Sequence, residues 1–312
     1  MKLDHVLSVS QFFDTSILEQ LFSRVAYLEQ ADKGNYLEPT LKGKMLATLF
    51  YEPSTRTRFS FESAMQKLGG NVITTESAGM FSSAIKGESL EDTIKITSGY
   101  ADAIVLRHPE LGSAARAAAV SEVPVINAGD GPGEHPTQAL LDLYTIKKEL
   151  GRIEGLKVAM VGDLRYGRTV HSLLQLLALF PQVSMYFVSP EVIGLPEKYS
   201  TYLKEKGVQF NHLQEFDSIL GEIDVMYVTR IQKERFASQD DYNSVKDAFV
   251  ITSKTLEKMK SNSIVMHPLP RVGEILPEVD SDNTRAAYFR QAKNGLYVRM
   301  ALLELLMQSR QT

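Results

Sequence analysis

KMLATLFYEPSTRTR, residues 44 to 58, contains in one short stretch the arrangement that repeats along the whole chain. Lys44 to Phe50 is a β-prone run, and Thr57 to Leu68 has the pattern of a helix. The polar loop Glu52 to Arg58 joins the two. A strand, a polar loop and a helix in this order form the βα unit of a parallel sheet, so the stretch predicts an α/β fold.

The same order recurs on both sides of a glycine-flanked turn, Gly151 to Gly155, which we interpret as a domain boundary. Before the turn, the expected strands are Lys44 to Phe50, Asn71 to Thr74, Ala103 to Leu106 and Val123 to Ile126, and the expected helices are Thr57 to Leu68, Leu90 to Ser98, Leu111 to Val120 and Thr137 to Leu150. After it, the expected strands are Lys157 to Val161, Val183 to Val188, Asp224 to Val228 and Ser263 to Met266. These patterns predict two doubly wound parallel-sheet α/β domains with the active site in the cleft between them.

The expected domains are residues 1–150 and residues 151–283. Apolar residues recur at helical spacing from Leu18 to Leu28, after the capping residue Asp14, and predict a first amphipathic helix. The segment Asn283 to Ser309 also has a helical pattern, with more apolar residues than one exposed helix needs. We therefore expect the C-terminal helix, residues 284–312, to pack back onto the first domain.

The composition excludes several classes of protein. With 312 residues, 44% of them hydrophobic, the chain resembles an ordinary globular protein. It has no cysteine, which excludes disulfide frameworks, thiolate nucleophiles and zinc ribbons. A net charge of -4 argues against a nucleic-acid-binding surface. No stretch approaches the ~18 consecutive apolar residues of a membrane span, and Met1 to His5 does not resemble a signal peptide, so a cytoplasmic location is expected.

The loop after the first strand has the features of an anion site. Ser54, Thr55 and Thr57 offer hydroxyls at the start of a helix, where backbone N–H groups point outward. In the simpler interpretation Ser54 caps the helix and the arginines are solvated. However, Arg56 and Arg58 stand at the positive end of a helix dipole, which favours an anion that compensates both cations.

Two further groups of polar residues are expected at the same edge of the first sheet. His135 and Gln138 follow the glycine-rich turn Gly129 to Gly133, between a strand and a helix, and Arg107 ends another strand. An imidazole, an amide or a guanidinium in such a place can polarise a carbonyl group. A histidine in a turn is more often structural, so this interpretation depends on its neighbours.

Two glycine patterns suggest a nucleotide site and are discounted. Gly129 and Gly131 begin a dinucleotide fingerprint, but Glu134 would place a negative charge near the pyrophosphate. Gly162 to Thr169 has the spacing of a phosphate-binding P-loop, except that Arg168 stands where lysine belongs. A planar guanidinium is better suited to a carboxylate. A P-loop nucleotide hydrolase therefore remains a weaker alternative.

Four ordered motifs resemble the aspartate/ornithine carbamoyltransferase family. They are Ser54 to Arg58 (STRTR), His135 to Gln138 (HPTQ), Asp163 to Ser172 (DLRYGRTVHS) and His267 to Arg271 (HPLPR). The resemblance implies transfer of the carbamoyl group of carbamoyl phosphate to the amine of L-aspartate, in pyrimidine biosynthesis, with no cofactor. Ornithine is the alternative acceptor, but the ornithine branch carries a cysteine where this chain has Pro268.

The resemblance also implies a role for each site residue. The residues expected to bind carbamoyl phosphate are Ser54, Thr55, Arg56, Thr57, Arg107, His135, Gln138, Leu269 and Pro270. Those expected to act in catalysis are Arg56, Thr57, Arg107 and His135. Leu269 and Pro270 would accept hydrogen bonds from the carbamoyl NH₂ through their backbone carbonyls, and Gln138 would assist them. Arg168 would bind the α-carboxylate of aspartate, and Arg230 with Gln232 its β-carboxylate.

The family resemblance implies partners as well. Ser82 and Lys86 would reach into the site of a neighbouring subunit, so the working unit would be a homotrimer with shared sites, which a regulatory chain could join. Glu52 would pair with Arg168 and Arg235 when the domains close. We expect no metal, because His135, His171 and His267 lack the close spacing of a zinc site. A non-catalytic scaffold of the same fold is disfavoured by the intact set of polar residues.

Overall fold

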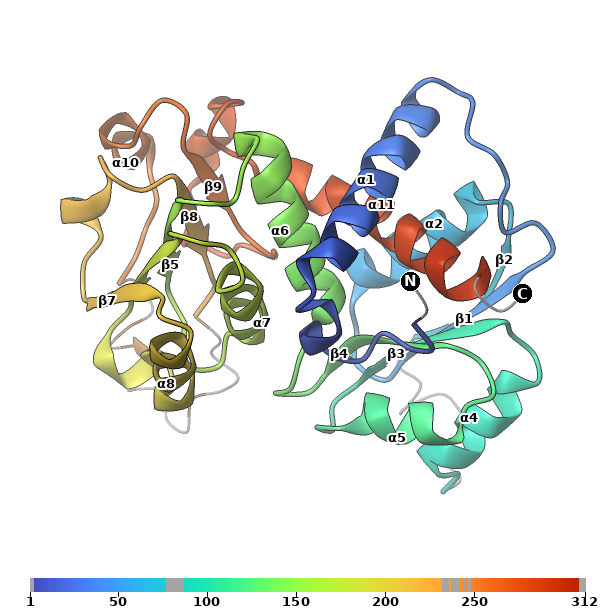
Figure 1. Cartoon of the computed structure of the whole chain (residues 1–312). Helices are drawn as coiled ribbons and strands as arrows, with labels where there is room; N and C mark the ends of the chain where they lie inside the picture. Colours follow the sequence, from blue (N-terminus) through green and yellow to red (C-terminus); the bar gives the residue numbers. More distant parts are fainter. Residues whose placement is uncertain are drawn as a thin grey trace. The chain divides into compact units, whose positions relative to one another are not determined.

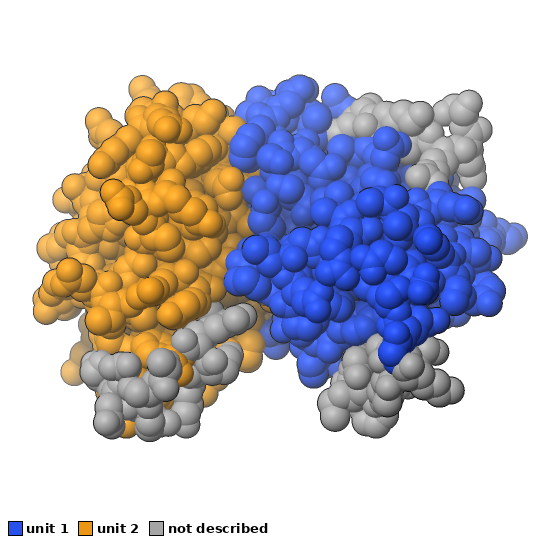
Figure 2. Space-filling model, turned by 90° about the horizontal axis from the view of Figure 1, so that it is seen from below, with its two compact units in different colours: residues 1–141, 293–312 blue, residues 142–292 orange. Residues whose placement is uncertain are grey.

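A computed structural model of the chain describes residues 3–76, 87–231, 236, 242–243, 245 and 248–308. The chain divides into two compact units (Figure 2). Unit 1 comprises Met1–Leu141 and Lys293–Thr312, and unit 2 comprises Asp142–Ala292. The predicted division at residues 150 and 283 stays a prediction, whereas these compact units divide inside two helices, α6 and α11.

Unit 1 is built on a four-stranded parallel sheet with the strand order β2-β1-β3-β4. Its strands are β1 (Met45–Phe50), β2 (Asn71–Glu76), β3 (Ala103–His108) and β4 (Val125–Asp130). Its helices are α1 (Thr15–Lys33), α2 (Thr55–Lys67), α4 (Leu90–Ser98) and α5 (Ser113–Val120), with the first part of α6 (Pro136–Leu150) and most of α11 (Tyr288–Gln308). A 3-10 helix, η1 (Val9–Phe12), precedes them.

The two faces of this sheet are covered by different helices (Figure 1). On one face, α4 and α5 bury Leu90, Ile94 and Ala117 against strand residues such as Ile104 and Leu106. On the other face lies α2, with α1 and α11 beyond it. Sheet and helices thus form the expected three layers of an α/β unit.

Unit 2 has a five-stranded parallel sheet with the order β7-β6-β5-β8-β9. Its strands are β5 (Lys157–Val161), β6 (Ser184–Val188), β7 (Gln209–Leu213), β8 (Val225–Val228) and β9 (Ile264–Met266). Its helices are α7 (Arg168–Leu177), α8 (Glu197–Glu205) and α10 (Ser253–Lys258), with short 3-10 helices η3 (Glu191–Ile193), η4 (Asp217–Ile219) and η6 (Pro277–Ser281). The predicted fold class, two parallel α/β sheets, is confirmed.

The sequence patterns missed two features of unit 2. The edge strand β7, QFNHL, was not expected, because polar and exposed residues interrupt its β pattern. The C-terminal helix begins at Tyr288 and not at Asn283. Val265 donates its N–H to Arg285 and accepts from the N–H of Ala287, so this segment is extended alongside β9 before the helix starts.

Candidate active site

The N-terminus of α2 presents hydrogen-bond donors at the carboxyl end of β1. Ser54 is the N-cap residue with extended backbone (φ -160°), but its side chain makes no capping hydrogen bond. Thr57 is buried, whereas Thr55 and Arg56 are exposed. The hydroxyl of Ser54 and the first N–H groups of the helix are therefore positioned to bind an anion.

The two arginines of this turn differ in their surroundings. Nη2 of Arg58 lies 2.9 Å from Oε2 of Glu76, and its Nη1 lies 3.8 Å from Oε1 of Glu62. In the described part of the chain, no carboxylate pairs with Arg56. Desolvation lowers the pKa of Arg56 from its usual value, although arginine stays a cation at neutral pH. Arg56 is thus the guanidinium available for an anionic ligand.

Arg107 lies beside this turn, because β1 and β3 pair in register with Phe50 opposite Arg107. Its Nη1 donates to the carbonyl of Ala128 at 3.3 Å, and its Nε lies 3.6 Å from Oε2 of Glu52. The predicted partners of Glu52 were arginines of the second domain. Within unit 1 Glu52 lies near Arg107, Arg235 lies outside the described residues, and the pairing of Glu52 in the closed state stays a prediction.

His135 and Gln138 begin α6, and the turn before them is held by Asp130. The Asp130 carboxylate accepts from the N–H groups of Gly112 and Glu134 at 3.1 and 2.8 Å. His135 is buried, with Nδ1 3.5 Å from Oγ1 of Thr137. The Asp130 carboxylate therefore fixes the glycine-rich turn by hydrogen bonds within the protein.

These residues share one edge of the first sheet. β1, β3 and β4 are adjacent and parallel, and the turns that follow them carry Ser54 to Thr57, Arg107, and His135 with Gln138. Carboxyl ends of parallel strands meet at the same edge, which is where α/β proteins bind ligands. Hydroxyls, helix N–H groups and cations at this edge suit a phosphorylated molecule with a carbonyl group.

Unit 2 brings Arg168 and Arg230 to the same edge of its own sheet. Arg168 is the first residue of α7, after β5, and Arg230 follows the adjacent strand β8. Gly162 has a φ of +113°, and a Cβ there would lie 2.3 Å from the carbonyl oxygen of Thr229. Only glycine allows this close approach of the two loops, and both arginines are half-buried.

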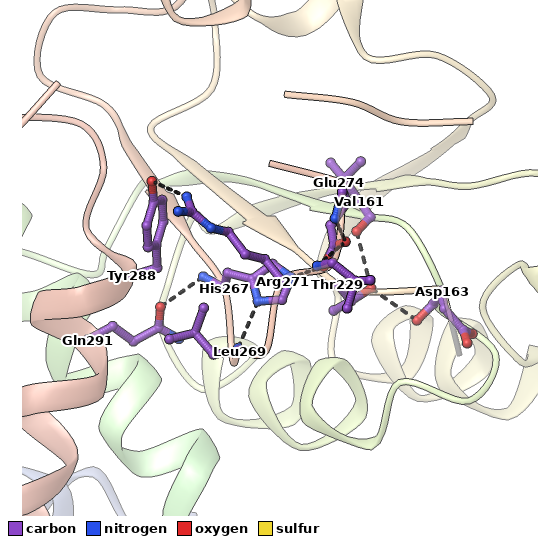
Figure 3. Close-up of polar contacts among 11 residues, drawn as sticks. Val161, Asp163, Thr229, His267, Leu269, Arg271, Glu274, Tyr288 and Gln291 are labelled. Carbon is purple, nitrogen blue, oxygen red and sulfur yellow. Dashed lines mark hydrogen bonds and ion pairs between the residues drawn. The ribbon is translucent and has the colours of Figure 1, made fainter. Parts of the chain in front are cut away.

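The loop after β9 is stabilised by its own polar groups (Figure 3). Nδ1 of His267 accepts from the N–H of Leu269 at 2.7 Å, so Nε2 carries the proton and donates to Glu274, also at 2.7 Å. Glu274 accepts in turn from the N–H groups of Val272 and Gly273. Burial opposes its ionisation, but these hydrogen bonds hold the pKa of Glu274 below its ordinary value.

A small pocket of about 140 Å³ lies between this loop and the loop after β8. Arg230 and Glu274 supply its charged groups. The remaining lining residues are Gly162, Thr229, Ile231, Tyr242, Phe249, Val250, Val272 and Gly273. Arg230 therefore borders a cavity in which a carboxylate could meet it.

His171 has a structural role. It is buried, its Nε2 lies 2.8 Å from the carbonyl oxygen of Leu164, and its ring stacks on Tyr199 with the centroids 4.2 Å apart. Burial lowers its pKa to about 4, so the ring is neutral at physiological pH. The described residues contain no group of three possible metal ligands, and none of their helices has the length and apolar character required to cross a bilayer.

Three predicted site residues, Gln232, Ser82 and Lys86, lie outside the described residues. Conversely, Asp130 and Glu274 hold the turns that carry the site and were not among the predicted site residues. Asp130 is the last residue of the buried strand β4, and a carboxylate there could have been noticed. Glu274 gave no such signal, because two of its partner groups are backbone N–H groups of its own loop and the third, His267, lies seven residues away in the sequence.

Two family descriptions match most of the chain. "Aspartate/ornithine carbamoyltransferase, carbamoyl-P binding domain" matches residues 4–148, and "Aspartate/ornithine carbamoyltransferase, Asp/Orn binding domain" matches residues 154–306. The two matches together span the strands and loops of both units.

Individual relatives agree with this match. Aspartate carbamoyltransferase 3, chloroplastic, of Pisum sativum is 53% identical over 307 residues, which are 98% of this chain and 78% of the relative. The catalytic subunit of M. jannaschii aspartate transcarbamoylase has a TM-score of 0.92 at 49% identity, covering 99% of each chain. Trypanosoma cruzi aspartate transcarbamoylase in complex with carbamoyl phosphate and aspartate has a TM-score of 0.92 at 38% identity, covering 98% of this chain and 97% of that one.

Proposed function

The chain belongs to the aspartate/ornithine carbamoyltransferase family, and from this premise we propose how its residues perform the reaction. It transfers the carbamoyl group of carbamoyl phosphate to the amine of L-aspartate, which yields N-carbamoyl-L-aspartate and phosphate. The observation that supports our assignment of roles best is the position of Arg56. It is a cation without a carboxylate partner among the described residues, at the N-terminus of α2.

Unit 1 supplies the groups for carbamoyl phosphate. The phosphate is bound by the hydroxyls of Ser54, Thr55 and Thr57, by Arg56 and by the first N–H groups of α2, which favour negative charge. Arg107 and His135 act on the carbonyl oxygen, together with Thr57.

These donors support the chemical step. The amine of aspartate attacks the carbonyl carbon, which forms the C–N bond and places negative charge on the carbonyl oxygen. When the C–O bond to phosphate breaks, its electron pair leaves with the phosphate, which takes up the proton that the attacking nitrogen loses. Arg56 stabilises the remaining charge of the phosphate. Losing one donor to such an oxyanion typically costs ~10²–10³ in rate. No covalent enzyme intermediate is needed.

The remaining groups come from unit 2. Backbone carbonyls of Leu269 and Pro270 accept from the carbamoyl NH₂, to which Gln138 of unit 1 also hydrogen-bonds. Arg168 pairs with the α-carboxylate of aspartate, and Arg230 with Gln232 pairs with the β-carboxylate. Guanidinium groups suit a dicarboxylic acceptor, whereas the side-chain ammonium of ornithine would require acidic partners.

We also propose a homotrimer in which Ser82 and Lys86 complete the site of a neighbouring subunit. Mixing an Arg56→Ala chain with a Lys86→Ala chain should then restore part of the activity that each lacks. If no activity returns after the subunits have been exchanged, shared sites are ruled out. Binding of a regulatory chain and a cytoplasmic location remain predictions. The pea relative is named as chloroplastic.

One experiment tests the function and the acceptor together. Purified protein is supplied with carbamoyl phosphate and either L-aspartate or L-ornithine, and the ureido product is identified by mass spectrometry. We expect N-carbamoyl-L-aspartate and phosphate in equal amounts. Citrulline as the main product would refute the assignment of the acceptor, and phosphate released without any ureido product would refute carbamoyl transfer.

A further inference from the structure

A buried polar network in unit 2 leads to the loop that carries Leu269 and Pro270. Asp142 of α6 is fully buried, and its carboxylate accepts from the hydroxyl of Tyr227 and from Nε2 of Gln291, each at 2.7 Å. Gln291 is 1% exposed. A charge in such a place is costly unless donors compensate it, so the residues around Asp142 must keep these donors in place.

Asp142 fixes the orientation of the Gln291 amide. Because the carboxylate can only accept hydrogen bonds, the NH₂ group of Gln291 must face it, and the amide oxygen must point the other way. That oxygen accepts from the backbone N–H of His267 at 2.9 Å (Figure 3). Hydrogen bonds therefore lead from a carboxylate on α6 to the first residue after β9.

The loop behind His267 needs such a support. Leu269 has a φ of +55°, in the left-handed region that non-glycine residues rarely adopt. Its N–H is held by Nδ1 of His267 at 2.7 Å. The backbone N–H of His267 is in turn held by Gln291, so the position of this ring, and with it Leu269, depends on Gln291.

The same carboxylate also reaches the start of α7. Tyr227 pairs in register with Met266, the residue before His267, and the side chain of Thr169 lies beside the Tyr227 hydroxyl. Thr169 follows Arg168. Among the donors to Asp142 are thus Gln291, which is connected to the loop after β9, and Tyr227, which lies beside the N-terminus of α7.

We propose that Asp142 is a positioning residue for the carbamoyl group, acting through Gln291 on the carbonyls of Leu269 and Pro270. The proposal rests on the function proposed above, in which these carbonyls accept from the carbamoyl NH₂. Asp142 does not touch the substrate. It keeps the amide oxygen of Gln291 pointed toward the N–H of His267. Gln291 in turn keeps the loop after β9 in the conformation in which the carbonyls of Leu269 and Pro270 can accept from the carbamoyl NH₂.

A reciprocal exchange of the two side chains tests this. In Asp142→Asn, the new side-chain oxygen can accept from Tyr227, but the new NH₂ group then faces the NH₂ group of Gln291. Gln291 can accept from that NH₂ only if its amide turns over, which places its own NH₂ against the N–H of His267. In Gln291→Glu, two carboxylates face each other. In the double variant, the three hydrogen bonds described above are restored: the Asn oxygen accepts from Tyr227, the Asn NH₂ donates to the new carboxylate, and that carboxylate accepts from His267.

The readouts are kcat/KM for carbamoyl phosphate and the inhibition constant of inorganic phosphate, both measured at a fixed aspartate concentration. We expect each single variant to lose about 10-fold or more in kcat/KM and the double variant to return to within about threefold of the wild type. Phosphate inhibition should stay unchanged throughout, because phosphate is held by residues of unit 1. A purely structural role would weaken both ligands together.

Two further variants keep the test decisive. Gln291→Met has a side chain of similar length and no hydrogen-bonding amide, and it should show the same selective loss in kcat/KM. It replaces Asp142→Asn or Gln291→Glu in the test if either of them fails to fold. Asp217→Asn removes an exposed carboxylate of the same unit, paired with Lys258, and should behave as the wild type. Single variants with wild-type kcat/KM, or a double variant no better than the singles, would overturn the proposal. A wild-type protein that forms no carbamoyl-aspartate would instead refute the proposed function.

Discussion

The polar loops of the two units use their side chains in opposite ways. At the N-terminus of α2 in unit 1, Ser54 makes no capping hydrogen bond, and Arg56 has no carboxylate partner among the described residues. In the loop after β9 of unit 2, His267 and Glu274 bond to each other and to backbone N–H groups of the loop. The first loop leaves its donors to a ligand, whereas the second uses its side chains to fix a backbone.

Because of this difference, we expect substitutions in the first loop to lower activity and substitutions in the second loop to lower folding stability. A side chain that serves mainly to bind a ligand contributes to activity and little to folding stability, because it makes few contacts in the ligand-free protein. A side chain that fixes a loop contributes to stability first. Four substitutions test this distinction, and their expected effects decrease from Arg56 through His171 and Glu274 to Arg58.

Arg56→Ala should have the largest effect. It removes a donor to the phosphate and to the charge that develops on it, so kcat should fall by ~10²–10³. The unfolding midpoint should stay unchanged or rise slightly, because a cation at a helix N-terminus opposes the dipole. Steady-state kinetics and thermal unfolding measure the two effects. A variant that unfolds early and keeps its kcat would contradict the distinction.

His171→Phe should change how stability depends on pH. The ring is buried and neutral in the folded state with a pKa of about 4, whereas the unfolded chain binds a proton below about 6.5. Folding stability is therefore lost as the pH falls from 6.5 toward 4, by about 3 kcal/mol from this residue. The variant keeps an aromatic ring against Tyr199 and should lose this part of the acid sensitivity.

Urea unfolding at pH 7.5 and at pH 5 measures the difference. The control is His212→Phe, at an exposed residue whose pKa is lowered less by burial. Equal loss of stability on acidification in the His171 variant and the wild type would show that His171 does not cause it.

Glu274→Gln should destabilise the loop after β9 by about 1–3 kcal/mol. An amide can still accept from His267, but its NH₂ then faces the N–H groups of Val272 and Gly273. Because the pKa of Glu274 is lowered in the folded state, its contribution is present above its unfolded pKa and lost as the pH falls. The variant's stability should therefore change less with acid than that of the wild type, as chemical unfolding between pH 7 and pH 3.5 would reveal. A steeper acid dependence would contradict this role.

Arg58→Ala should have the smallest effect on catalysis, although it lies only one helical residue beyond Thr57. Its guanidinium is engaged by Glu76 and Glu62, so we expect a loss of about 1 kcal/mol in stability and less than about threefold in kcat. It is the matched control for Arg56→Ala, and a kcat as low as that of the Arg56 variant would mean that both arginines serve the ligand.

The sequence was most informative where pattern and chemistry coincide. The run Lys157 to Val161 is entirely apolar after its first residue and was predicted with the bounds that the structure has. The strand β7 was missed because an edge strand need not be apolar. In the candidate site, the positions of Arg107 and His135 on one sheet edge followed from the parallel order of the strands.

The support behind that site could not be predicted in the same way. Asp142 stands within the run Ala139 to Leu143, and a carboxylate among apolar helix residues indicates a buried partner, but not which one. Its partners Tyr227 and Gln291 are far away in the sequence and become neighbours only when α6, β8 and α11 pack. Likewise, nothing in the sequence STRTR indicates that Arg58, its second arginine, forms an ion pair with Glu76.

Unit 1 is assembled from two segments that the ribosome produces far apart in time. Its last helical segment follows the whole of unit 2, and there Glu304 binds Arg24 at 2.6 Å and also accepts from Thr40. Until translation is almost finished, the nascent first unit lacks this helix, while the sheet of unit 2 already has all its strands. Unit 1, whose synthesis begins first, is therefore completed last. A chain that ends before Lys293 would leave the apolar surface of unit 1 exposed to chaperones and proteases.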